Sequence, residues 1–289
     1  VTYVGVDELG TVNPKDVKEA LRPETILVSI MYANNEIGTI QPIKEIAKVV
    51  RNFRKTKLIQ KGPPFLNTKR AALFEDFENL PYFHTDACQA TNYLDMNVLK
   101  LGVDLLTING SKIYGPKGIG VLYVKRGTSI TPIIYGGGQE RGLRGGTENV
   151  SAVVGFAQAC KTAEEMKEKE TQRLTGLRDY FIKNLLLNIP ESILNGDKKN
   201  RLPNNVNISI PNIDSEQLVI ELDAKGISAS ARSACKSRDY ESSYVIIALG
   251  RKSLPNEGGV RFSLGRETRK KDIDYVLKVL SKIIKKIQI

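Results

Sequence analysis

Apolar and polar positions follow strand-like and helix-like patterns in turn over the first 150 residues. Pro14, which suits the first turn of a helix, precedes apolar positions at helical spacing, and the apolar run 26–30 is typical of a buried strand. A second helical pattern begins near Ile43. Strand, helix, strand in this order predicts parallel pairing through crossovers, and therefore a layered α/β domain. Further strands are expected at residues 82–87, 105–109 and 120–124.

The pattern breaks down between residues 51 and 81 into basic residues, a Gly-Pro-Pro turn and scattered aromatics. Segments of this composition usually run over the protein surface and tolerate insertions. We therefore expect an inserted surface loop at about residues 52–80, with no assigned role.

Helical spacing predicts one long helix, or two helices in line, over residues 148–189. The side chains expected on its apolar side are Val150, Val153, Val154, Ala157 and Cys160.

The remaining sequence alternates short strand and helix patterns, which indicates a smaller α+β domain. We expect a large domain at residues 1–167 and a small domain at residues 168–289. The elements expected in the small domain are a strand at 205–210, a helix capped by Asp214 or Ser215, a short strand near Ile227, a helix near Tyr244, a strand at 259–264 and an amphipathic helix after Thr268.

Composition limits the classes of protein to which the chain can belong. It has 289 residues, 41% of them hydrophobic, with no apolar run long enough to cross a bilayer, so we expect a cytoplasmic protein without membrane contact. The formal charge of +11 suits an acidic partner. Much of the excess lies on amphipathic helical stretches, and no nucleic-acid module is present, so nucleic acid is a disfavoured partner. Three scattered cysteines exclude a disulfide framework, and no metal site is predicted.

Polar residues follow two of the predicted strands at the ends where open parallel sheets bind ligands. Asp86 ends one strand, and Lys112 follows another in a Gly-Pro turn. A carboxylate there can keep a pyridine nitrogen protonated, while an amine can form a Schiff base with an aldehyde. Each residue alone is more often a cap, an ion pair or an exposed side chain.

Several motifs together resemble one family. They are Asn-Asn-Glu-Ile-Gly at 34–38, the pair Asp86 and Gln89, Lys-Ile-Tyr-Gly-Pro-Lys-Gly at 112–118, the segment 136–147, Ser-Ala-Cys at 233–235 and Arg-Phe-Ser-Leu-Gly-Arg at 261–266. Their order is that of group I cysteine desulfurases, in the class V aminotransferase superfamily of pyridoxal-phosphate enzymes of fold type I. The resemblance implies a mostly parallel sheet flanked by helices, followed by a smaller α+β domain, with pyridoxal 5'-phosphate as the cofactor.

The resemblance implies roles for the residues at the matching positions. Lys112 would form the Schiff base with the cofactor and then move protons on the substrate carbon. Asp86 would pair with the pyridine nitrogen, and Gln89 would donate to the ring hydroxyl. Thr147 resembles the threonine that reaches the phosphate of the neighbouring subunit, which implies a homodimer.

The substrate side carries over in the same way. Asn35 would lie beside the ring and the substrate, and Arg261 would hold the carboxylate of L-cysteine with its two-donor fork. Cys235, in a polar stretch with neighbouring cations, would take the sulfur as a persulfide, release alanine and pass the sulfur to an acceptor or scaffold protein. Iron–sulfur cluster assembly and tRNA thiolation are the pathways implied. Cys88 and Cys160 are expected to serve packing, and His84 is expected to support Asp86.

Two features depart from the family pattern. Asn109 and Ser111 stand where relatives commonly have Ser and His; both can still donate to a phosphate, but the imidazole beside the lysine is lost. Relatives also carry a substantial segment before the position of Val1, with a phosphate cradle and a stacking His. We therefore expect a chain that lacks its N-terminal part, inactive and poorly folded alone.

Two other interpretations remain open. The first is another fold type I enzyme, a selenocysteine lyase or an aminotransferase, although a transaminase needs no thiol at Cys235. The second is a non-catalytic basic adaptor or RNA-binding protein of the same fold, which would bind RNA in a salt-sensitive way and be indifferent to Lys112→Ala.

Overall fold

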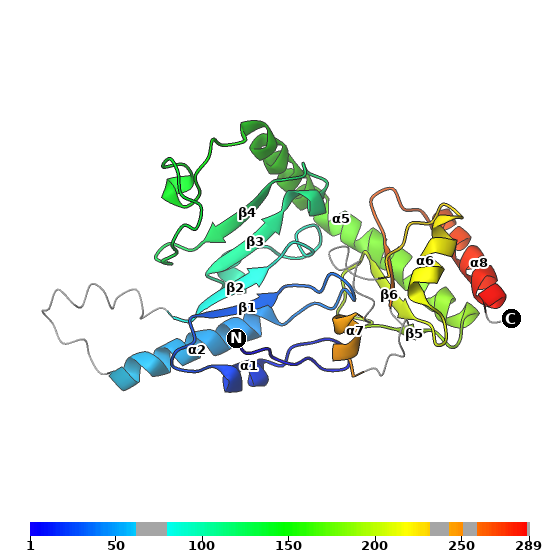
Figure 1. The fold of residues 1–289 in the computed structure, drawn as a ribbon, viewed down its shortest axis with the longest axis horizontal. Helices are drawn as coiled ribbons and strands as arrows, with labels where there is room; N and C mark the ends of the chain where they lie inside the picture. Colours follow the sequence, from blue (N-terminus) through cyan, green and yellow to red (C-terminus); the bar gives the residue numbers. More distant parts are fainter. Residues whose placement is uncertain (62–79, 232–242, 251–258, 288–289) are drawn as a thin grey trace, which may run out of the picture. The chain divides into compact units, whose positions relative to one another are not determined.

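The strongest apolar runs form the strands of one sheet in the computed structural model, which describes residues 1–61, 80–231, 243–250 and 259–287. The sheet order is β1-β2-β3-β4 (Figure 1). β1 pairs with β2, and β2 with β3, in parallel, whereas β3 and β4 are antiparallel. A short turn joins β3 to β4 without a crossover helix, so β4 must return in the opposite direction. The strands are β1 (Leu27–Met31), β2 (Tyr82–Asp86), β3 (Leu105–Asn109) and β4 (Gly120–Val124).

The described chain divides into two units, which we name by their sheets. The large-sheet unit comprises Pro14–Tyr32 and Pro42–Glu165, and the small-sheet unit comprises Val1–Asn13, Ala33–Gln41 and Met166–Ile289. The N-terminal segment and residues 33–41 thus group with the C-terminal part of the chain. The two-domain assignment at 1–167 and 168–289 stays a prediction.

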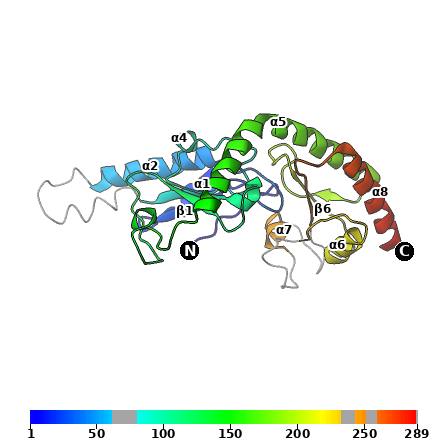
Figure 2. The same ribbon diagram turned by 90° about the horizontal axis from the view of Figure 1, so that it is seen from above.

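Helix α2 (Ile43–Lys61) contacts β2, α1 (Pro14–Ala20) and α4 (Val98–Leu101), and it lies along the sheet (Figure 2). Its buried positions, spaced three and four residues apart, include Ile43, Ile46 and Val50. The helix continues to Lys61. The surface loop expected at about 52–80 was therefore placed too early in the sequence, because residues 52–61 are helical.

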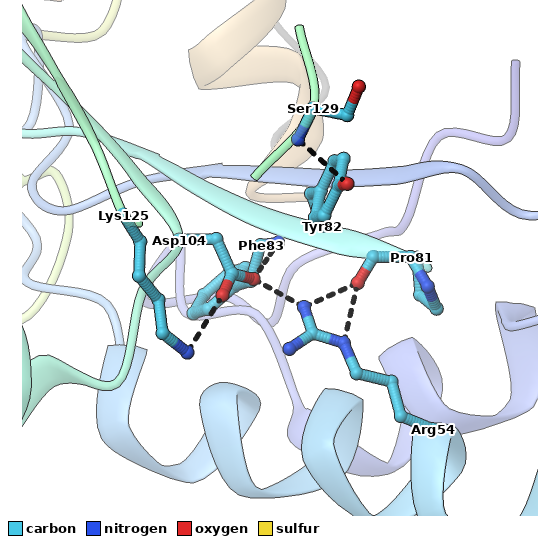
Figure 3. Close-up of polar contacts among 7 residues, drawn as sticks. All are labelled: Arg54, Pro81, Tyr82, Phe83, Asp104, Lys125 and Ser129. Atoms are coloured by element: carbon cyan, nitrogen blue, oxygen red, sulfur yellow. Dashed lines mark hydrogen bonds and ion pairs between the residues drawn. The ribbon is translucent and has the colours of Figure 1, made fainter. Parts of the chain in front are cut away.

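Polar anchors explain why the helix continues through a basic stretch that the sequence suggested was a loop. The Arg54 guanidinium donates to the carbonyl of Pro81 at 2.9 Å and forms an ion pair with Asp104 (Figure 3). The Asp104 carboxylate, which is buried, also accepts from the backbone N–H of Phe83 at 2.9 Å. Lys57 donates to the carbonyl of Pro23 at 2.7 Å. Charged residues here hold the helix against the sheet edge.

The long helix α5 (Val150–Asn188) is continuous, but its predicted apolar side is wrong. Val153 is 44% exposed, and Val150 and Val154 are more exposed still. Small residues are buried instead, because the helix approaches a turn closely. A Cβ at Gly155 would lie 2.7 Å from Pro116 Cγ, and one at Gly115 would lie 3.0 Å from the Ala159 Cβ.

The small-sheet unit contains an antiparallel sheet in the order β5-β6-β7. Phe181 of α5 packs edge-on against Phe262, with ring centroids 5.3 Å apart. Helices α6 and α8 lie side by side (Figures 1 and 2). Asp214 caps α6, as expected, by accepting from two backbone N–H groups. The elements are β5 (Ile193–Leu194), β6 (Asn205–Ser209), β7 (Val260–Ser263), α6 (Ser215–Asp223), α7 (Tyr244–Ala248) and α8 (Lys270–Ile287).

The strand expected near Ile227 does not form. Within the described residues of this segment, up to 231, the contact with the sheet is a bridge between Ser230 and Arg261. Among the helices that the structure describes, none combines the length and apolarity needed to span a bilayer.

Candidate active site

Asp86 ends β2 with its carboxylate exposed at the carboxyl end of the parallel strands. Its Oδ1 accepts from the backbone N–H of Cys88 at 2.9 Å, which folds the chain into the turn that follows. In the sheet register Asp86 stands between Met31 of β1 and Thr107 of β3. The carboxylate is therefore fixed by its own turn and open to a ligand.

Lys112 lies in the short 3-10 helix η1 (Gly110–Ile113) that follows β3. Asn109 caps this helix, since its Oδ1 accepts from the backbone N–H and hydroxyl of Ser111 at 2.9 and 2.7 Å. Asn92 donates to the Lys112 carbonyl at 2.9 Å. Lys112 is exposed, whereas the next residue, Ile113, is fully buried and anchors the turn. The backbone of Lys112 is thus held while its amine is free to bind.

The half-buried Cys88 thiol reports on both groups. Its pKa is raised to about 12, mainly by burial and in part by a hydrogen bond to the Asp86 carboxylate and the charge of that group, while the Lys112 ammonium opposes the rise. Amine and carboxylate therefore both act on one thiol at the same edge of the sheet. A thiol with this pKa stays protonated at neutral pH, so Cys88 is a poor nucleophile.

His84 bridges three strands. Its Nδ1 lies 2.8 Å from the Ser29 hydroxyl, and its Nε2 lies 2.9 Å from the Thr107 hydroxyl. Burial lowers the pKa of His84, although the nearby Asp86 opposes this. The ring is therefore neutral at physiological pH, and it positions the strand ends around Asp86 through partners that sequence reasoning missed.

The other predicted cofactor residues occupy different surroundings. Gln89 is half-buried in the turn after Asp86, and Asn109 and Ser111 are exposed and bonded to each other. Thr147 is exposed ahead of α5. The structure brings Asp86 and Lys112 together, keeps Gln89 next to Asp86, and gives Thr147 no hydrogen bond among the described residues.

Asn35 and Arg261 meet in the small-sheet unit. Arg261 of β7 donates from Nη1 to the Asn35 carbonyl at 2.8 Å. Its Nε is buried and has no hydrogen-bond partner among the described residues. Burial lowers the pKa of Arg261, while the charge of Glu36 opposes this. The Arg261 guanidinium is thus oriented through Nη1 and still has a donor, Nε, without an acceptor, which suits a ligand carboxylate.

The turn that carries Asn35 is held by groups that sequence reasoning missed. The buried Glu36 carboxylate accepts from the Ser243 hydroxyl at 2.5 Å. The Glu36 carbonyl accepts from the side-chain amides of Asn205 and Asn207 at 2.9 and 3.0 Å. These partners come from distant parts of the chain. The only sequence signal for them is the presence of two polar residues, Asn205 and Asn207, in the otherwise largely apolar strand β6.

The donor set fits pyridoxal phosphate. Asp86 offers a carboxylate for a pyridine nitrogen, Lys112 offers an exposed amine for an aldehyde, and Asn109 with Ser111 offers phosphate donors. Cys235 lies outside the described residues, within 232–242. Among the residues with a described position, no group of three or more His, Cys, Asp or Glu side chains could hold a metal ion.

Comparison with known proteins identifies a family of pyridoxal-phosphate enzymes, which agrees with a donor set that fits this cofactor. The family model "Aminotransferase class-V" matches residues 1–59 and 78–276, leaving out the segment between them. A cysteine desulfurase IscS of Dictyoglomus turgidum is 43% identical over 288 residues, which cover 100% of this chain and 66% of that protein. The mitochondrial cysteine desulfurase of Arthroderma benhamiae is 40% identical over 97% of this chain and 50% of its own length.

A solved structure titled "NIFS-LIKE PROTEIN" superposes with a TM-score of 0.82 at 31% identity, covering 99% of this chain and 68% of that one. A NifS-like protein from Rickettsia africae gives a TM-score of 0.81 at 28% identity, over 98% and 69%. The chain spans about two thirds of the length of these two structures and of the Dictyoglomus relative.

Proposed function

Because this chain belongs to the class-V aminotransferase family, whose model matches most of its length, we propose that it acts as a cysteine desulfurase. L-cysteine would become L-alanine, and its sulfur would pass to Cys235 as a persulfide. The motif resemblance to this family is confirmed, as is the fold: a mostly parallel sheet with flanking helices.

The observation that carries the proposal is the position of Asp86 at the carboxyl end of β2 and of Lys112 directly after the neighbouring parallel strand β3. It supports a carboxylate and an amine at one cofactor site, as a pyridoxal-phosphate enzyme requires. When bound, pyridoxal phosphate supplies an electron sink for the carbon that carries the substrate amine. Asp86 would hold a proton on the pyridine nitrogen, and the Lys112 amine would accept and return the proton of the substrate carbon.

Four further residues would complete the cofactor site. Gln89 would donate to the ring hydroxyl. The Ser111 hydroxyl, which donates to Asn109 Oδ1 in the structure, would turn to the phosphate, and the Asn109 side-chain N–H would donate to the phosphate as well. Thr147 would serve the phosphate of a second subunit, so the proposed assembly is a homodimer.

Arg261 and Asn35 would bind the substrate. The unpartnered Nε of Arg261 would donate to the carboxylate of L-cysteine, and the Asn35 carbonyl would keep the guanidinium oriented. The Cys235 thiolate attacks the substrate sulfur, an S–S bond forms and the C–S bond breaks. The electron pair of that bond stays on carbon, which takes a proton to give alanine.

The sulfur would leave Cys235 for an acceptor or scaffold protein, in iron–sulfur cluster assembly or tRNA thiolation. The net charge of +11 supports an acidic acceptor. We place this reaction in the cytoplasm.

Alanine and sulfide release from L-cysteine tests the proposal, with pyridoxal phosphate and a thiol reductant present. With the full-length gene product, we expect equal amounts of both products from the wild type, and loss of both in Lys112→Ala and Cys235→Ser. Cys160→Ala, on α5, is the matched control and keeps the activity. A keto acid product that survives Cys235→Ser would show a transaminase instead.

A further inference from the structure

A basic pocket lies in the small-sheet unit, and none of its lining residues has a role in the proposed reaction. Its volume is about 480 Å³, within the range of small-molecule sites. One wall comes from the end of α5 and the other from the turn before β6. The lining residues are Arg178, Asp179, Ile182, Lys183, Lys198 and Lys199.

The charge of the lining is one-sided, with four cationic side chains and one carboxylate. That carboxylate, Asp179, is already engaged, because its Oδ1 accepts from Arg178 Nε at 2.9 Å. The side chains of Lys183, Lys198 and Lys199 are exposed, and none forms an ion pair with a residue that the structure describes. Three ammonium groups thus face one cavity without a counter-charge of their own.

One of the four lining cations, Arg178, is buried, and a second buried guanidinium, Arg201, adds its charge to the field of the pocket. Arg178, only 4% exposed, donates from Nη1 to the Arg201 carbonyl at 2.8 Å. Arg201 is 3% exposed, and its Nε and Nη1 have no partner among the described residues. Burial and the neighbouring Arg178 charge lower the pKa of Arg201 to about 10, which leaves it charged at neutral pH. Charges in so dry a place act strongly on a nearby anion.

The turn with two of the lysines is held in place before any ligand binds. The Asp197 carboxylate accepts from the backbone N–H groups of Lys199 and Asn200 at 2.7 and 3.0 Å. Asn200 donates in turn to the Ile40 carbonyl at 3.0 Å. A fixed turn lowers the entropy cost of ordering a site on binding.

We infer that this pocket binds a small phosphate-bearing anion. Lysine ammonium groups are compact point charges that suit phosphate oxygens. Their grouping around one cavity, rather than along a stripe, favours a compact anion over a long nucleic-acid or acidic peptide chain.

Isothermal titration with pyrophosphate tests the inference on the full chain. The protein is first loaded with pyridoxal phosphate and the unbound cofactor is removed, so that the proposed cofactor site is filled and no free phosphate ester competes for the pocket. We expect one site per chain, weakened about tenfold or more in Lys198→Gln/Lys199→Gln, because each charged hydrogen bond contributes that much. The matched control is Lys282→Gln/Lys285→Gln on α8, which removes the same charge from exposed positions and keeps the affinity.

Equal weakening in the control, or no heat of binding in the wild type, would overturn the inference. Tighter binding of a poly-glutamate peptide than of pyrophosphate would do so as well. Circular dichroism checks that the double variant folds, and Lys183→Gln replaces it with the same expectation where it does not. Because none of these residues serves desulfuration, an inactive enzyme that binds pyrophosphate would leave the pocket established.

Discussion

Cys88 allows the two proposed cofactor groups to be tested one at a time. In cofactor-free protein carrying Cys160→Ala and Cys235→Ala, Asp86→Asn should lower the Cys88 pKa, because a negative charge that opposes the thiolate is removed. Lys112→Gln should raise it, because a favourable cation is lost. The rate at which iodoacetamide alkylates Cys88 at one fixed pH measures both shifts, because that rate follows the fraction of thiolate. Shifts of the same sign in the two variants would place one of the groups away from this edge.

Arg261 is the residue on which substrate affinity should depend. Arg261→Lys keeps the charge but loses the planar two-donor fork. We expect KM for L-cysteine to rise about tenfold to a hundredfold, with a smaller change in kcat, since a charged hydrogen bond is lost. Steady-state alanine formation measures both constants. An unchanged KM would remove Arg261 from the substrate site.

Sequence alone could predict that Asp86 ends a strand and that Lys112 follows one, because the apolar runs of both strands are plain, whereas the roles of the two residues stay predictions. It could not predict Glu36 with Asn207, or His84 with Ser29 and Thr107. Those contacts depend on strand register and on segments that meet only after folding. Cys235 remains a prediction, since it lies outside the described residues.

At the scale of elements, the C-terminal half of α2 should be stabilised by its polar anchors. Arg54→Met leaves the buried Asp104 with the more exposed Lys125 as its ion-pair partner and leaves the Pro81 carbonyl without this donor. We expect the free energy of unfolding to fall by about 2 to 3 kcal/mol. Urea unfolding measures it. Lys55→Met, on the same helix and exposed, should change it by less than about 0.5 kcal/mol; equal effects would contradict the role of the anchor.

The boundaries of an element could be predicted where hydrophobicity alone determines them. The bounds of β3 and β4 agree with the sequence, because short apolar runs end at polar turns. The apolar face of α5 was misassigned because close approach at Gly155 selects small residues over large ones, and hydrophobicity alone does not show this. The end of α2 was missed because its contacts are polar and come from residues distant in the sequence.

At the scale of the whole molecule, the exposed valines of α5 follow shortly after Thr147, the residue whose resemblance implies a second subunit. Exposed apolar groups of this kind often mark an interface. We expect Val153→Asp to shift the protein from dimer to monomer in sedimentation velocity. Leu187 is also apolar, is more exposed than Val153 and lies near the other end of the same helix, so Leu187→Asp should leave the dimer intact. A wild-type monomer at all concentrations would contradict the homodimer.

Among the described strands, β1 pairs with β2 alone, so its other edge carries backbone groups without a strand neighbour. Its sequence, Leu-Val-Ser-Ile-Met, contains neither charge nor proline, the usual protections against unwanted strand addition. A strand from another molecule can therefore pair with β1 at that edge. Concentrated samples should therefore form intermolecular β-structure, which thioflavin fluorescence would detect. A co-expressed polypeptide that pairs with the free edge of β1 should prevent this rise in fluorescence.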